Sequence, residues 1–239
     1  MNNLSREQLC LALDVDNQFI AKKLVQELSD YVGIFKIGFQ LFVAEGPQII
    51  SAIRNSGSEI FLDLKFHDIP NTVAEVSRVV TGLGVSMFNI HAVGGIDMMT
   101  AAVKAASSEA KHIGIEKPKV LAVTLLTSLD EYALQDQLRV KDTVQDYVVH
   151  LALLAKKSGI DGVIASPQEI GLIRSTCGPN FIIGTPGIRM PDSSPDDQKR
   201  TLAPKQAIDA GATFIIVGRP IRNAKDPVMA AKEILNELE

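Results

Sequence analysis

Residues 59–72 read EIFLDLKFHDIPNT, and the way this stretch folds governs the interpretation of the whole chain. Its apolar first half is typical of a buried strand. Side chains on a strand alternate between two faces, so Asp63 and Lys65 are expected to share one face. Ionised side chains are buried only when paired, and a buried pair is weak evidence for stability. The pair therefore indicates a role in a chemical reaction more than a role in stabilising the fold.

The rest of the chain alternates between short apolar runs and segments with helical periodicity. Eight runs are predicted to be strands: 9–15, 33–37, 60–65, 87–91, 120–125, 162–165, 181–184 and 214–218. Helices are predicted over 19–28, 72–83, 97–110, 143–157 and 227–238. In the first of these helices the apolar stripe is formed by Ile20, Leu24, Val25 and Leu28.

Eight strands alternating with helices in 239 residues predict an α/β fold, a single (β/α)8 TIM barrel, with one domain over residues 1–239. The alternative is an open doubly wound sheet, which usually has a glycine-rich turn after its first strand. Here the first strand ends in LDVDN at 13–17, without glycine. No Pro/Ser-rich linker or charge block divides the sequence. These features favour the barrel.

The composition restricts the class of protein. Hydrophobic residues make up 46% of the chain and the net charge is −4, which argues against a surface for nucleic acid or anionic membrane. No apolar run reaches the ~18 residues of a membrane span, and no signal-peptide pattern is present. Cys10 and Cys177 are far apart and show no zinc-ligand spacing, so two reduced thiols are expected. The sequence predicts a cytoplasmic protein.

The barrel prediction places several charged residues at one opening. Active sites of this fold lie at the C-terminal ends of the strands. Asp14 is at the end of the first predicted strand, Lys36 is near the end of the second, and Asp63 and Lys65 end the third. A structural ion network is the plainer alternative. However, barrel interiors favour apolar side chains, so four alternating charges on three adjacent strands indicate a catalytic site.

Two glycine-containing loops follow the last two strands: GTPGIR at 184–189 and GRPI at 218–221. The usual phosphate site of a barrel is formed by these loops. Glycine lets backbone N–H groups approach an anion, and arginine supplies paired donors. Residues 190–202 between them are poor in apolar residues, which is typical of a surface loop or of a mobile lid. Gln198 and Arg189 would be the contacts of such a lid.

With these motifs placed, the chain resembles the orotidine 5′-phosphate decarboxylase family in its short monofunctional bacterial form. The resemblance covers essentially the whole length. Its most specific part is DLKFHDIPNT at 63–72, and further matches in order and spacing are LD at 13–14, KIG at 36–38, LTS at 126–128, PGIR at 186–189 and VGRPI at 217–221.

The resemblance implies a decarboxylase of orotidine 5′-phosphate that makes UMP as a homodimer, with no metal and no organic cofactor. It implies that Lys36, Asp63 and Lys65 form an alternating charge chain beneath the pyrimidine. Asp68 would join this chain from the neighbouring subunit, and Thr72 would reach the partner's substrate.

The resemblance also implies contacts with the rest of the nucleotide. Asp14 would bond the ribose hydroxyls, and Thr127 would contact the base. Gln198 and Arg189 would close on the phosphate, with Gly218 and Arg219 beneath it. Loss of CO₂ from C6 leaves a carbanion in the ring plane, so a fixed ammonium that also carries a proton is needed there. Lys65 can supply both.

Three other functions share parts of this pattern. A Mg²⁺-dependent sugar-phosphate decarboxylase would need an acidic ligand at the end of the second strand, where this chain has Lys36. A Schiff-base aldolase would need a neutral lysine, which flanking carboxylates oppose. A phosphate-sugar binding or scaffold protein would not need alternating charges. His67 and His91 are interpreted as packing residues.

Overall fold

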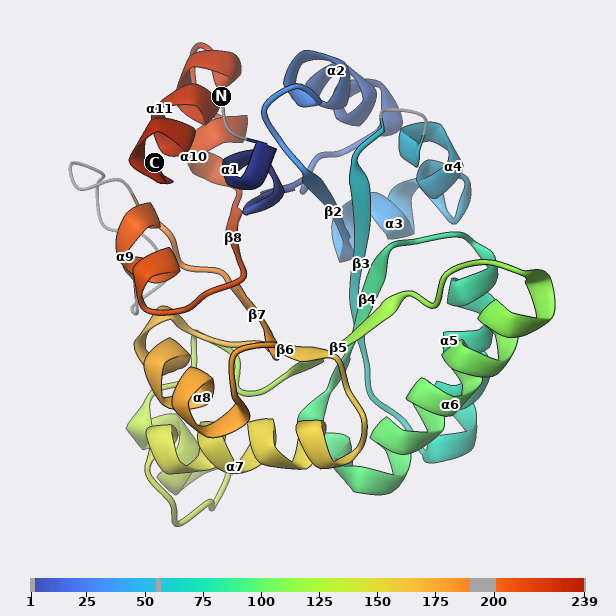
Figure 1. The fold of residues 1–239 in the computed structure, drawn as a ribbon, viewed down its shortest axis with the longest axis vertical. Coiled ribbons are helices and arrows are strands. Elements are labelled where there is room, and N and C mark those ends of the chain that lie inside the picture. Colours follow the sequence, from blue (N-terminus) through green and yellow to red (C-terminus); the bar gives the residue numbers. More distant parts are fainter. Residues whose placement is uncertain (1–2, 55–56, 190–200, 239) are drawn as a thin grey trace.

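The computed structural model describes residues 3–54, 57–189 and 201–238. Eight parallel strands close into a barrel in sequence order, from β1 to β8, and β8 pairs with β1 (Figure 1). The strands are β1 Leu9–Ala12, β2 Ile34–Gly38, β3 Glu59–Phe66, β4 Met87–His91, β5 Lys119–Val123, β6 Gly162–Ile164, β7 Ile182–Thr185 and β8 Phe214–Val217. The prediction of a (β/α)8 barrel is confirmed.

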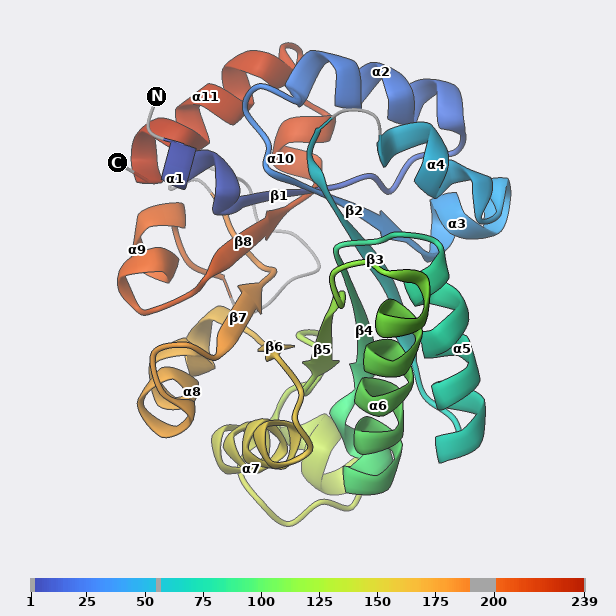
Figure 2. The same ribbon diagram turned by 45° about the vertical axis from the view of Figure 1, so that its right-hand side comes forward.

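Helices surround the barrel on the outside (Figures 1 and 2). The α-helices are α1 Asn3–Glu7, α2 Gln18–Leu28, α3 Phe39–Glu45, α4 Gln48–Arg54, α5 Pro70–Gly82, α6 Gly95–Ile113, α7 Val144–Lys157, α8 Ile170–Cys177, α9 Pro204–Asp209, α10 Arg219–Arg222 and α11 Pro227–Leu238. Two 3₁₀ segments, η1 Ala92–Gly94 and η3 Pro167–Glu169, and a π-helical turn, η2 Ala133–Gln137, lie in the loops. None of the helices in these described ranges is long and apolar enough to cross a membrane.

The apolar side chains form two cores, because alternate residues of each strand point into the barrel or outwards to the helices. The outer core lies between sheet and helices and includes Leu11, Phe35 and Leu62. The inner core fills the barrel and includes Cys10, Ile34, Phe61, Phe214 and Ile216. Phe61 and Phe214 meet edge to face with ring centroids 6.3 Å apart. They form part of an apolar floor below the C-terminal opening.

Among the described strands, the pairing of β3 with β4 is irregular. The pairing runs Phe61 to Met87 and Leu62 to Phe88, and it resumes with Phe66 to Ile90. Three residues of β3 therefore stand opposite a single residue of β4, which is the geometry of a bulged strand. The bulge contains Asp63 and Lys65, the two charged residues of this strand that were predicted to share a face.

The prediction of the α2 stripe was partly wrong. The buried residues of this helix are Ala21, Leu24, Val25 and Leu28, and Ile20 is 43% exposed. At about 100° per residue, Ile20 lies roughly 90° from the centre of the buried face. Both cysteines are buried free thiols, as predicted.

Candidate active site

Three neighbouring strands bring the predicted charges together at the C-terminal end of the barrel. Asp14 lies two residues beyond β1, Lys36 is in β2, and Asp63 and Lys65 are in β3. All four side chains line one cavity of about 270 Å³. Below them the cavity is lined by the inner core, including Phe61 and Ile216. The four charges are thus placed over an apolar floor.

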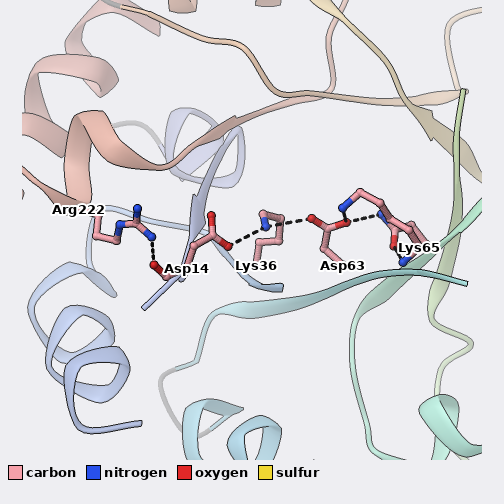
Figure 3. Close-up of polar contacts among 6 residues, drawn as sticks. Asp14, Lys36, Asp63, Lys65 and Arg222 are labelled. Atoms are coloured by element: carbon pink, nitrogen blue, oxygen red, sulfur yellow. Dashed lines mark hydrogen bonds and ion pairs between the residues drawn. The ribbon is translucent and has the colours of Figure 1, made fainter. Parts of the chain in front are cut away.

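The charges alternate along a row of short contacts (Figure 3). Lys36 Nζ lies 3.3 Å from Oδ1 of Asp14 and 2.9 Å from Oδ2 of Asp63. Lys65 Nζ lies 2.6 Å from Oδ1 of Asp63. At the other end of the row, Arg222 Nη1 donates a hydrogen bond to the backbone carbonyl of Asp14. Both oxygens of Asp63 are therefore occupied by ammonium groups.

Burial and pairing oppose each other in this row. Burial alone would raise the pKa of the Asp63 carboxyl, but Lys36 and Lys65, with hydrogen bonds from Lys65 and Asn89, lower that pKa to about 2. Burial would lower the pKa of Lys36, but the Asp63 and Asp14 carboxylates raise it above its usual value. Lys36 and Asp63, only 7% and 8% exposed, are therefore held as ions inside the barrel.

Lys65 has an unusual backbone conformation, with φ = +47° in the left-handed region. Its backbone N–H donates to Oδ1 of Asn89 at 2.8 Å, and its ammonium lies 5.4 Å from the centre of the Phe39 ring. A non-glycine residue with positive φ is uncommon and often marks a functional position. The ammonium is thus fixed between Asp63 and an aromatic ring, facing the cavity.

Gly38 leaves the space in which Asp14 and Lys36 meet. A Cβ atom there would lie 2.9 Å from Oδ1 of Asp14 and 3.2 Å from Nζ of Lys36. Its φ of −95° is open to any residue, so the backbone conformation does not require glycine. What requires glycine at this position is the proximity of the two charged groups.

The two predicted phosphate loops lie on the rim of the same cavity. Arg189, Gly218 and Arg219 all line it. Gly187 has φ = +81°, which glycine adopts without strain. Leu202 donates its backbone N–H to the carbonyl of Gly187 and accepts one from Arg189, at 3.2 and 3.0 Å. Gln198 and residues 190–200 of the predicted lid lie outside the described residues.

The remaining predicted residues occupy different positions. Thr127 lines the cavity and is half-buried. Asp68 and Thr72 are exposed and are not among the described residues that line it. Asp68 accepts the backbone N–H of Ile69 at 2.6 Å. The rings of His67 and His91 are tilted by 46° with centroids 5.6 Å apart, and neither residue is among the described residues that line the cavity.

Sequence reasoning missed three residues of this site: Asn89, Arg222 and Phe39. Asn89 is fully buried in β4 and donates to Oδ1 of Asp63 at 2.7 Å. A polar residue inside the apolar strand MFNIH was the available signal. Arg222 follows Arg219 by one helical turn, which could have placed it at the same rim. Phe39 gave no signal, because its role depends on where the Lys65 side chain lies.

The side chains of the site can be examined for groups that would bind a metal ion. No cluster of three or more His, Cys, Asp or Glu side chains that could hold a metal ion occurs within residues 3–54, 57–189 and 201–238. At Asp63 the two oxygens already contact ammonium groups. A divalent cation would have to displace Lys36 or Lys65 to bind there.

Comparison with known proteins identifies the family. The family model described as orotidine 5′-phosphate decarboxylase / HUMPS family matches residues 7–234. Orotidine 5′-phosphate decarboxylase of Syntrophomonas wolfei subsp. wolfei is 50% identical over 98% of this chain and 99% of its own length. The protein of that name from Geobacter sulfurreducens is also 50% identical, over 98% of this chain and 97% of its own length. A crystal structure of orotidine 5′-phosphate decarboxylase from Lactobacillus acidophilus has a TM-score of 0.85 at 36% identity, covering 97% of this chain and 98% of that one. The chain therefore belongs to the orotidine 5′-phosphate decarboxylase / HUMPS family.

Proposed function

We propose that this chain is a carboxy-lyase that converts orotidine 5′-phosphate to UMP and CO₂, the last step of de novo UMP biosynthesis. The observation that carries the proposal is the alternating row Asp14, Lys36, Asp63 and Lys65, which faces the same cavity as Arg189 and Arg219. Membership of the family and the names of its relatives support the same reaction.

The reaction needs the features that this row offers. The bond between C6 and the carboxylate breaks, CO₂ leaves, and the electron pair stays on C6 in the ring plane, where the π system cannot delocalise it. A fixed positive charge lowers the energy of that carbanion, and a proton donor completes the reaction. In our proposal Lys65 does both, and Asp63 holds its ammonium in place at 2.6 Å.

Other residues of the cavity hold the nucleotide in this proposal. Asp14, whose side chain is 41% exposed beside the opening, bonds the ribose hydroxyls. Thr127 contacts the base. Arg189, Gln198, Gly218 and Arg219 bind the phosphate. Contacts with the phosphate are remote from C6, so their binding energy can be used to position the ring over Lys65.

We propose that no metal and no organic cofactor takes part. The end of β2 carries the Lys36 ammonium, whose pKa the neighbouring carboxylates raise, and a second cation there would be repelled. A Schiff base at Lys36 would require the neutral amine, which the paired carboxylates disfavour.

We also propose a homodimer in which Asp68 and Thr72 reach the partner's site. Both residues are exposed in the single chain. Ile69, next to Asp68 in the chain, is 67% exposed, and Phe39, whose ring centre lies 5.4 Å from the Lys65 ammonium, is 55% exposed. Phe39 follows β2 and Ile69 follows β3, so both lie at the same end of the barrel. Exposed apolar side chains of this kind are typical of a protein–protein interface.

The experiment that tests the function follows the absorbance of orotidine 5′-phosphate on addition of the purified protein, with EDTA present throughout. Steady loss of substrate in EDTA is the expected result. No turnover at all would overturn the proposed reaction, and turnover that stops in EDTA and returns with Mg²⁺ would overturn the metal-free proposal. Trapping of a covalent adduct by borohydride during turnover would instead point to a Schiff base.

A further inference from the structure

The bulge in β3 removes a regular hydrogen bond from the sheet at Lys65. Between the pairs Leu62–Phe88 and Phe66–Ile90, β3 has three residues and β4 has only Asn89. Within this bulge Lys65 has a left-handed φ of +47° instead of the extended conformation of a regular strand. When the backbone N–H of a half-buried strand residue leaves the ladder, it needs another acceptor, since leaving it without one is costly.

The side chain of Asn89 supplies that acceptor. Its Oδ1 accepts the Lys65 N–H at 2.8 Å, and its Nδ2 donates to Oδ1 of Asp63 at 2.7 Å. This is the amide orientation that satisfies both partners, because the backbone N–H is a donor and the carboxylate an acceptor. One amide therefore connects the backbone of Lys65 to the carboxylate of Asp63.

The position of Asn89 makes this connection rigid. Asn89 is fully buried, and its own backbone is held in β4 by the regular pairing with β5. Oδ1 of Asp63 accepts from both Asn89 and Lys65, and Oδ2 contacts Lys36. Rotation of the carboxylate would therefore break contacts on both oxygens. Asn89 itself does not belong to the described lining of the cavity.

We propose that Asn89 is a positioning residue for the reaction: its amide sets the bulge of β3 and so fixes the Lys65 ammonium and the Asp63 carboxylate relative to C6 of the substrate. This inference rests on the proposed function for its catalytic consequence. Asn89 would act through Lys65 and Asp63, because it is not among the described residues that line the cavity. A displacement of the order of 1 Å at a reacting group can cost about 10²-fold in rate.

The test compares kcat and KM for orotidine 5′-phosphate in Asn89→Ala and Asn89→Asp with those of the wild type. For Asn89→Ala we expect kcat to fall about 10²-fold, with KM nearly unchanged because substrate contacts remain. Asn89→Asp keeps the shape and the acceptor for Lys65 but loses the donor for Asp63. Its kcat should therefore rise as the pH falls from about 7 towards 5, since a shared proton restores the donor.

The matched control is Thr81→Val, which removes the buried hydrogen bond from the Thr81 hydroxyl to the Ser77 carbonyl at 2.8 Å in α5. It tests whether loss of a buried hydrogen bond away from the site changes the rate, and we expect its kcat and pH profile to stay at wild-type values. A kcat of Asn89→Ala within threefold of wild type would overturn the inference. So would an Asn89→Asp pH profile parallel to that of the wild type.

A measurement on the wild type does not depend on how the variants fold. Hydrogen exchange at the Lys65 amide should be slow, because its N–H is bonded to a buried acceptor. Rapid exchange at this amide would overturn the inference. If the wild type fails to turn over orotidine 5′-phosphate, the proposed function fails instead, and the exchange rate still decides whether Asn89 holds the bulge.

Discussion

Lys65 Nζ and Asp63 Oδ1 lie 2.6 Å apart, although the two residues belong to the same strand and are separated by only one residue. The contact forms within a bulge, where Lys65 adopts a left-handed conformation. A strand whose only requirement was regular hydrogen bonding to its neighbours would not need this bend. We therefore regard the contact as a feature kept for the proposed reaction.

Replacement of Lys65 tests the proposed proton donor. Lys65→Ala removes both the positive charge and the proton at C6, so we expect kcat to fall by about 10³-fold or more. Absorbance loss of orotidine 5′-phosphate measures the rate, and circular dichroism checks the fold. Lys111→Ala, which removes an exposed lysine of α6, should keep full activity. Unchanged turnover by Lys65→Ala would contradict the mechanism.

The depressed pKa of Asp63 predicts an acid dependence of stability. Folding lowers the pKa of Asp63 to about 2. The ionised carboxylate therefore stabilises the folded protein at pH values above the pKa that Asp63 has in the unfolded chain, and this stabilisation is lost as the pH falls towards 2. The loss is about 2 kcal/mol in the free energy of unfolding, between about pH 4 and pH 2. Urea titrations at several pH values should show a shallower acid slope for Asp63→Asn than for the wild type. A parallel slope would contradict the assignment, and exposed Asp136→Asn serves as control.

A shared site between subunits can be tested by mixing inactive chains. Asp68→Ala and Lys65→Ala are each expected to be inactive alone. If Asp68 serves the partner's site, a mixed dimer has one site with both lesions and one site with neither. Random reassociation should then recover about a quarter of wild-type activity. No recovery in a mixture shown to contain mixed dimers would contradict the arrangement.

Removal of the phosphate contacts should affect the rate as well as binding. With orotidine, which lacks the phosphate, we expect kcat to fall together with kcat/KM, because remote binding energy positions the ring. Arg219→Ala should have the same effect on the full substrate, by about 10²-fold in kcat/KM. Lys205→Ala removes an exposed charge from α9 and is the control. A rise in KM with constant kcat would mean that the phosphate serves binding alone.

The sequence predicted the barrel well because buried parallel strands are short, apolar and separated by helices. The interval 87–91 was predicted to the residue, and β3 to within one residue at each end. The short helices α3 and α4 were missed. Each has seven residues, and Gly46 and Pro47 lie between them, so neither is long enough to show a periodic pattern.

The site was predictable to the extent that it follows from strand ends. Asp14, Lys36, Asp63 and Lys65 were placed correctly at one opening, because parallel strands deliver their C-terminal ends to the same side. The bulge was not predictable, since it depends on pairing between β3 and β4. For the same reason Asn89 was overlooked. The family predicted from the motifs is confirmed, whereas the roles of all the predicted site residues, including Asp68, Thr72 and Gln198, stay predictions.

The space left by Gly38 has a consequence for how this protein tolerates sequence change. A methyl group at position 38 would meet only the ends of two flexible side chains, so the fold would survive while Asp14 and Lys36 were pushed apart. Saturation mutagenesis should therefore recover folded but inactive proteins at position 38. A residue that donates no group to the reaction would then rank among the least replaceable, and selection for activity would keep glycine where selection for stability alone would not.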